Sequence, residues 1–153
     1  MTVKEEERYR RLSEDLIGDW RLKQMKNYIQ HGSITTYDHC LQVARTAFSL
    51  KCSLKINCDE RTLVRAALLH DYFLYDWHDH GDHLHGYHHP YIAAEKADMD
   101  FSLTEREKRA IMTHMWPLTL LHPPVSKEGW LLTLADKMVS TRETLFMRGR
   151  VEV

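Results

Sequence analysis

The sequence predicts an all-α fold, a compact bundle of helices around one core. Apolar residues recur at intervals of three and four positions along most of the chain, which is the period of a helix with one buried face. No segment shows the apolar–polar alternation of a half-buried strand. Ser, Thr, Asp or Pro precedes several of the periodic stretches, at positions where helices commonly begin.

The first half of the chain is predicted to hold three helical regions. Residues 4–30 form one broken helix or two short ones, with Gly18 near the join. Thr35 or Thr36 can cap a second helix, and a turn ending at Asp59 leads into a third. The third helix is the one that carries the most informative residues of the chain.

The second half is predicted to hold a loop and three more helices. Residues 77–87 contain two glycines and no periodicity, which is typical of a loop. Pro90 suits the first turn of a helix, and Ser102 or Thr104 can cap the next one. The last helix is expected over residues 127–146.

Composition excludes several classes of protein. The chain has 153 residues, and we expect a single domain over residues 1–153. The net charge of −1 gives no signature of nucleic-acid binding. No uncharged apolar run approaches the roughly 20 residues of a membrane-spanning helix, and the charged N-terminus does not look like a signal peptide. Three cysteines without C-x-x-C spacing fit a reducing compartment, so we expect a cytoplasmic protein with no membrane partner.

A His-Asp pair interrupts the apolar face of the third helix. That face consists of Leu63, Ala66, Ala67, His70, Asp71 and Leu74. Burying an unpaired carboxylate costs several kcal/mol or forces its protonation. A bound metal cation removes that cost, so the pair indicates a metal site.

Other segments present polar groups of the same kind. His39, His114 and Asp136 lie on otherwise apolar helical faces, and His89 precedes Pro90 at an expected helix start. Imidazole and carboxylate ligands without thiolate suit a catalytic site for Fe, Mn, Zn, Co or Ni. Four imidazoles and two carboxylates are enough for two metals if one carboxylate bridges them.

The order H…HD…H…H…D on a helical chain resembles the HD-domain superfamily of metal-dependent phosphohydrolases. The resemblance extends from about Thr35 to Ser140. The matching segments are Tyr37-Asp38-His39, Leu68-Leu69-His70-Asp71, His89-Pro90-Tyr91-Ile92-Ala93-Ala94-Glu95, Ile111-Met112-Thr113-His114 and Leu134-Ala135-Asp136. On this basis we expect N-terminal helices over 1–34 and an HD core over 35–146.

The resemblance implies a reaction and a ligand set. It implies hydrolysis of a phosphoester or phosphoanhydride of a small molecule, such as a nucleotide, by metal-bound hydroxide. The implied cofactors are two divalent transition-metal ions, Fe or Mn first and Zn, Co or Ni as alternatives. The implied metal ligands are His39, His70, Asp71, His89, His114 and Asp136. Asp71 would bridge the metals, and Asp71, His89 and His114 would be the catalytic residues.

Two other functions fit the same residues. HD-type di-iron oxygenases use the same order of six ligands. A metal-stabilised HD domain can also sense a nucleotide or bind a partner without turnover. The segment 89–97 is similar to part of the HD-GYP phosphodiesterases, but the chain lacks their tandem histidines at His114, which Met115 follows, and it lacks their G-Y-P motif. This difference argues against cleavage of cyclic di-GMP.

A second group of residues is predicted to contact substrate on weaker grounds. It consists of His78, His85, His88, Trp116 and Lys137. His88 competes with the adjacent His89 for the role of ligand, whereas Lys137 follows Asp136 and offers a cation to a phosphate. The expected partner is a phosphorylated small molecule or nucleotide. The oligomeric state stays open, with a homodimer among the choices.

Overall fold

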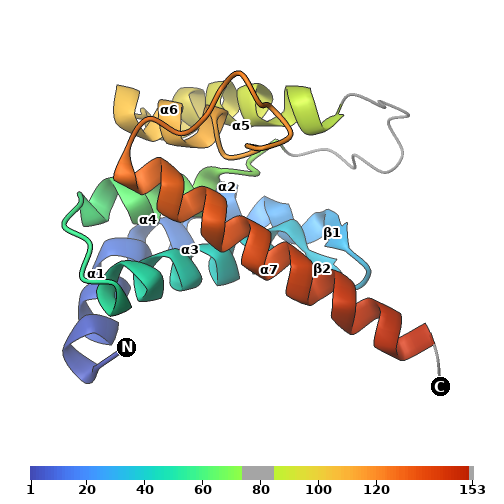
Figure 1. Ribbon diagram of the computed structural model, residues 1–153, viewed down its shortest axis with the longest axis horizontal. Helices are drawn as coiled ribbons and strands as arrows, with labels where there is room; N and C mark the ends of the chain where they lie inside the picture. The colour runs from blue at the N-terminus through green and yellow to red at the C-terminus, as the bar shows by residue number, and fades with distance from the viewer. Residues whose placement is uncertain (74–84, 152–153) are drawn as a thin grey trace.

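We describe residues 1–73 and 85–151 in a computed structural model, with only the backbone described for residues 85, 86 and 146–151 (Figure 1). Helices account for most of the described chain, which confirms the all-α prediction. The elements in chain order are α1 (Val3–Gly18), α2 (Trp20–Lys23), the 3-10 helix η1 (Gln24–Asn27), β1 (Ile29–His31), β2 (Ile34–Thr35), α3 (Thr36–Ser53), α4 (Glu60–Leu69), α5 (His85–Phe101), α6 (Glu105–Met112) and α7 (Lys127–Val151). Among the described residues, no helix is both long and apolar enough to cross a membrane.

Helix α4 lies at the centre of the molecule. It packs against α1, α3, α6 and α7, while α5 and α6 form a layer on one side (Figure 1). From Thr62 to Phe73 every residue is buried except the half-buried Arg65. The last four residues of α4, 66–69, are all apolar and fully buried, as expected for a segment that neighbouring helices enclose. The His-Asp pair at its C-terminal end is therefore carried into the interior.

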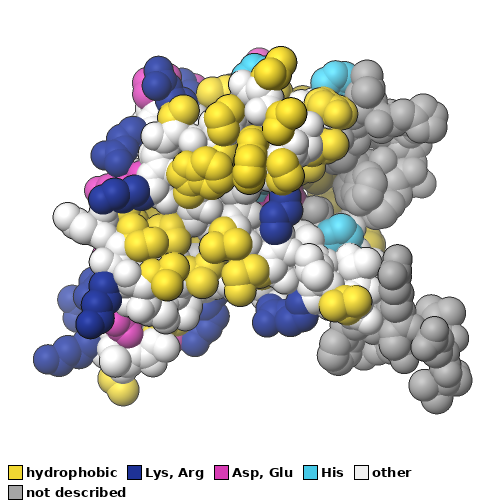
Figure 2. All heavy atoms as spheres, viewed as in Figure 1, with side chains coloured by type: hydrophobic (Ala, Val, Ile, Leu, Met, Phe, Trp, Pro, Cys, Tyr) yellow, Lys and Arg dark blue, Asp and Glu magenta, His cyan; other side chains and the backbone are white. Residues whose placement is uncertain are grey.

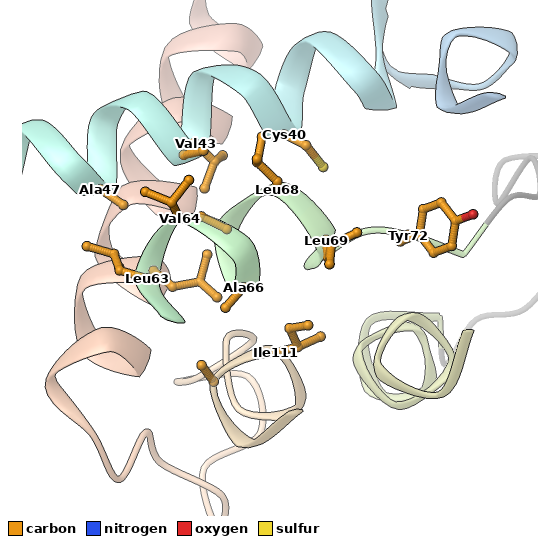
Figure 3. Close-up of a cluster of buried hydrophobic side chains, with 14 of the residues drawn as sticks. Cys40, Val43, Ala47, Leu63, Val64, Ala66, Leu68, Leu69, Tyr72 and Ile111 are labelled. Carbon is orange, nitrogen blue, oxygen red and sulfur yellow. The ribbon is translucent and has the colours of Figure 1, made fainter. Parts of the chain in front are cut away.

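The core fills the space between α4 and its neighbours. Figure 3 shows Val43 and Ala47 of α3 facing Leu63 and Val64 of α4, with Ile111 of α6 on the other side. On α7, Leu132, Ala135 and Val139 are buried at helical spacing, as the sequence pattern predicts. These contacts hold the faces that carry the polar residues of the site in fixed relative positions.

Local signals mark where the helices begin. The Asp59 side chain accepts the Thr62 N–H at 2.6 Å and caps α4. The Thr104 hydroxyl accepts the Glu107 N–H, and the Glu107 carboxylate accepts the Thr104 N–H, which forms a capping box at α6. Thr35 caps α3, so the expected start of that helix is confirmed.

The expected helix boundaries are wrong in four places. A short antiparallel hairpin, β1–β2, follows η1, with Gly32 in its turn at φ 59°, where a glycine is favoured. Helix α5 begins at His85, so Tyr87 is helical and Pro90 lies inside the helix instead of in its first turn. Proline has no backbone N–H and cannot make the hydrogen bond of a helix interior. Because His89 and Pro90 are both buried, we attribute the helical turn before Pro90 to packing. Helix α7 extends to Val151.

The fourth difference concerns His70 and His114, which lie at helix ends rather than within helices. His70 is the C-cap of α4, and His114 follows Thr113, the C-cap of α6. The Nδ1–H of His70 donates to the Ala67 carbonyl at 2.8 Å, and that of His114 donates to the Ile111 carbonyl at 2.6 Å. A continuing helix would bond each of these carbonyls to the backbone N–H four residues on, so the rings compete with helix extension.

Candidate metal centre

Six polar side chains converge in the interior from five segments of the chain. They are His39 of α3, His70 and Asp71 at the end of α4, His89 of α5, His114 in the turn after α6, and Asp136 of α7. All six are buried, and none is more than 6% exposed. Side chains of this polarity are seldom fully buried unless they are paired or bind a metal.

Asp71 divides the cluster into two halves. Its Oδ2 atom lies 3.8 Å from His39 Nε2 and 3.5 Å from His70 Nε2. Asp136 Oδ1 lies 3.2 Å from His39 Nε2 and 3.8 Å from His70 Nε2. We call His39, His70, Asp71 and Asp136 the first subsite.

The other oxygen of Asp71 faces a different pair of imidazoles. Asp71 Oδ1 lies 3.2 Å from His89 Nε2 and 3.7 Å from His114 Nε2, and these two nitrogens are 3.2 Å apart. We call Asp71, His89 and His114 the second subsite. Ligand atoms that share one ion at about 2.1 Å lie roughly 3.0–3.4 Å from one another. The separations in both subsites are close to that range.

Three atoms of the cluster support the presence of a cation. His39 Nε2, His70 Nε2 and Asp71 Oδ1 are buried and have no hydrogen-bond partner within the described part of the chain. Orphaned buried polar atoms are rare and costly, and these three border the two subsites. Nitrogen and oxygen donors in this arrangement fit divalent transition metals.

The orientation of two rings also fits metal binding. A carbonyl oxygen can only accept, so the contacts of His70 with Ala67 and of His114 with Ile111 require a proton on each Nδ1. The Nε2 atom of each ring is then the nitrogen that can bind an ion, once it is unprotonated. Hydrogen bonds of this kind commonly orient metal-binding histidines.

The electrostatics of the two subsites differ in the absence of a bound cation. Burial and the nearby charges of His70 and His89 lower the pKa of His114 to about 3. Burial also lowers the pKa of His39, but the adjacent carboxylates of Asp136 and Glu143 outweigh it and raise that pKa to about 10. Burial raises the pKa of Asp71, but the charge of His70 and the close contact with His89 bring it below its ordinary value. The first subsite therefore carries protons that an ion must displace.

We predict that filling the first subsite releases protons. His39 and His70 both have raised pKa values, and a metal ion can bind their Nε2 atoms only after the protons leave. Affinity for Mn²⁺ should therefore rise between about pH 6 and pH 8, because the ligands must be deprotonated before they bind. Calorimetric titration in buffers of different ionisation enthalpy measures the protons released. Affinity that falls with pH would contradict the assignment.

The sequence analysis missed three residues that adjoin the first subsite. Gln30 of β1 donates its amide to Asp71 Oδ2 at 2.7 Å and accepts the Thr36 hydroxyl at 3.3 Å. His31 lies edge-on to His39, with ring centroids 5.9 Å apart. Glu143 Oε2 lies 2.9 Å from His39 Nδ1. Glu143 is in helical phase with Asp136, seven residues earlier, which is the one signal that could have identified it.

The residues predicted to contact substrate are dispersed. His78 lies outside the described residues, and only the backbone of His85 is described, at the start of α5. His88 is exposed, whereas the adjacent His89 is buried in the second subsite. The structure therefore places His89, and not His88, among the six converging residues.

Trp116 and Lys137 line an apolar pocket on the outer side of α7. Trp116 packs edge-on against Trp130 at 5.0 Å, and the pocket has a volume of about 510 Å³. Figure 2 shows hydrophobic side chains gathered on this face of the molecule. Lys137 Nζ reaches inward to Asp136 Oδ2 at 3.0 Å and to the His114 carbonyl at 3.3 Å. Lys137 thus stands between the pocket and the ligand cluster.

Comparison with known proteins identifies the family. The model of the HD domain family matches residues 36–140, a range that holds all six converging residues and excludes Gln30, His31 and Glu143. No curated protein and no solved structure matches the chain significantly. HD domains bind divalent metals and are generally metal-dependent phosphohydrolases. Because the match covers most of its length and every polar residue of the cluster, the chain belongs to the HD domain family.

Proposed function

We propose that this protein is a metal-dependent phosphohydrolase acting on a phosphorylated small molecule. The observation that carries the proposal is Asp71, whose two carboxylate oxygens face two separate sets of imidazole nitrogens. A carboxylate in this position can bridge two cations, and paired metal ions suit the displacement of a phosphoryl group. We propose Fe or Mn as the native metal because the ligand set lacks thiolate.

Bound divalent ions would lower the pKa of water from about 15.7 to about 7 and neutralise charge on the phosphoryl oxygens. His39, His70 and Asp136 would hold the first ion, His89 and His114 the second, and Asp71 both. Gln30 holds the Asp71 carboxylate in place through its 2.7 Å hydrogen bond. Ser140 does the same for Asp136, since its hydroxyl donates to Oδ1 at 3.1 Å.

The described residues near the cluster do not favour a covalent route. The sulfur of Cys40 lies 3.8 Å from His70 Nδ1, but Cys40 is only 1% exposed and packs in the core. The Ser140 hydroxyl is already bonded to Asp136. Direct attack of water on phosphorus is therefore the mechanism that these residues support. Lys137 supplies a partly exposed cation beside Asp136 that can pair with a substrate phosphate.

A labelled-water experiment tests the reaction. The protein is loaded with Mn²⁺ or Fe²⁺ and screened anaerobically against phosphorylated metabolites, nucleotides included, in ¹⁸O-labelled water. We expect one ¹⁸O atom in each released phosphate, because hydrolysis takes its oxygen from solvent. Inorganic phosphate should inhibit competitively by binding the same cations.

Two results would count against the proposal. Turnover that requires dioxygen and releases no phosphate would identify an oxygenase. Stoichiometric metal with nucleotide binding but no turnover of any phosphate ester would identify a binding module.

A further inference from the structure

Glu143 is a buried carboxylate that the matched family region does not include. It lies on α7, three residues beyond the match at 36–140, and its side chain is 3% exposed. One of its oxygens, Oε2, is 2.9 Å from His39 Nδ1. The other, Oε1, is buried and has no hydrogen-bond partner within the residues that the structure describes. A carboxylate desolvated to this degree has a large cost that its contacts must offset.

The contact with His39 sets which ring nitrogen can bind a metal. A carboxylate accepts, so His39 carries its proton on Nδ1 and donates it to Glu143. Once its own proton has left, the opposite nitrogen, Nε2, can present its lone pair to the space that Asp71 and Asp136 border, 3.8 and 3.2 Å away. Glu143 therefore selects the tautomer that the first subsite requires.

His39 differs in this respect from two other imidazoles of the cluster. His70 and His114 donate Nδ1–H to the neutral carbonyls of Ala67 and Ile111. His39 donates to a full negative charge, which makes a stronger hydrogen bond and a more basic ligand nitrogen. Extra basicity at a single ligand strengthens one subsite and leaves the other unchanged.

We propose that Glu143 is a positioning residue that raises the metal affinity of the first subsite through His39. The inference rests on the metal centre of the proposed function and is independent of the reaction catalysed there. Partners of this kind typically change metal affinity by about 10- to 100-fold.

A third metal ion between His31, His39 and Glu143 is the competing interpretation. The ligand atoms of these residues lie within 4.8 Å of one another. However, His39 has two ring nitrogens, of which Nε2 faces Asp136 and Nδ1 is at hydrogen-bond distance from Glu143. An ion there would need the lone pair of Nδ1 and would displace the proton that makes this bond. The contact distance favours the hydrogen bond.

The structure supplies a matched control on the same helix. Glu128 is also buried on α7, at 0% exposed, and accepts from the Asp59 N–H at 2.7 Å and from Arg106 at 2.9 Å. Within the described part of the chain, the hydrogen bonds and ion pairs of its carboxylate go to Asp59 and Arg106 and to none of the six converging residues. Glu128→Gln therefore reports what the loss of a buried charge on α7 does to the fold alone.

Calorimetric titration with Mn²⁺ tests the proposal on the wild type, Glu143→Gln and Glu128→Gln. Each is also measured in the His114→Ala background, which removes a ligand of the second subsite. We expect Glu143→Gln to weaken the first-subsite binding event about 10- to 100-fold and the second less than about twofold. Glu128→Gln should leave both events unchanged.

Imidazole ¹H–¹⁵N spectra of the Zn²⁺-loaded proteins supply a readout that a purely structural role would not move. The Nδ1–H resonance of His39 should shift in Glu143→Gln and stay in place in Glu128→Gln. Equal affinities in the wild type and Glu143→Gln, equal losses in both variants, or the loss of a third ion would each overturn the inference. A wild type that binds no metal would instead sink the proposed metal centre itself.

Discussion

Asp71→Ala is expected to remove both metal ions and to abolish phosphate release. Its carboxylate is the one group that both subsites share, with Oδ2 facing His39 and His70 and Oδ1 facing His89 and His114. Loss of one preorganised electrostatic group commonly costs about 10²- to 10³-fold in rate, and here two cations are lost with it. We therefore expect a fall of more than about 10³-fold, measured as phosphate release alongside elemental analysis.

Two further variants make the result specific. His114→Ala removes a ligand of the second subsite alone and should cost about one ion per chain while sparing much of the fold. His122→Ala alters an exposed histidine outside the cluster and should change neither metal content nor rate. If Asp71→Ala and His114→Ala had equal and small effects on metal content, the two residues would not belong to one site.

The helical phase of the ligands was predictable because local sequence determines it. His39 and Asp136 lie on helices whose buried positions follow the 3.6-residue period, and each is buried as its phase predicts. The caps at Asp59 and Thr104 were predictable for the same reason, since each depends on residues within three positions. The metal-binding role of the converging residues stays a prediction until an ion is measured.

The ends of α4 and α6 were not predictable from periodicity. The apolar pattern continues through His70 toward Leu74, yet the ring of His70 bonds the carbonyl that the next turn would need. His114 makes the equivalent contact with Ile111. At both residues a single side-chain hydrogen bond ends the helix and orients the ring, and the hydropathy pattern does not predict that hydrogen bond.

The residues around the first subsite were missed because tertiary packing places them there. Gln30 lies in a strand of three residues, which is too short to show alternation. Glu143 is in phase with Asp136 and Val139, but a glutamate near the end of a helix is ordinarily exposed. Only the position of His39 on α3 shows that this carboxylate has a buried partner.

Removing the metal ions with a chelator is expected to lower the melting temperature by roughly 10–20 °C at neutral pH. Each ion that binds only the folded chain adds about 2.7 kcal/mol at 100 times its Kd. A chain of about this size shifts by about 2–4 °C per kcal/mol. Differential scanning fluorimetry with and without chelator measures this difference in melting temperature. Asp71→Asn, an isosteric variant without the bridging charge, should show only a small difference.

The difference in melting temperature between the metal-bound and metal-free protein should increase between pH 7 and pH 9, because protonated imidazoles stabilise only the metal-free fold. Burial lowers the pKa of His39 and His70, but their acidic partners raise both, that of His39 to about 10. The unfolded value is about 6.5, so this stabilisation is complete below about pH 6.5 and is lost as pH rises toward 10. His114, with a pKa lowered to about 3, acts with the opposite sign and only below about pH 6.5.

In the metal-bound protein the imidazoles of the first subsite are already unprotonated, so its stability lacks that decline and metal affinity increases with pH. A difference in melting temperature that decreases from pH 7 to pH 9 would mean that His39 and His70 are not protonated in the metal-free protein. In that case the carboxylates of Asp136 and Glu143 would not be keeping the His39 imidazole protonated, as their contacts with that ring indicate.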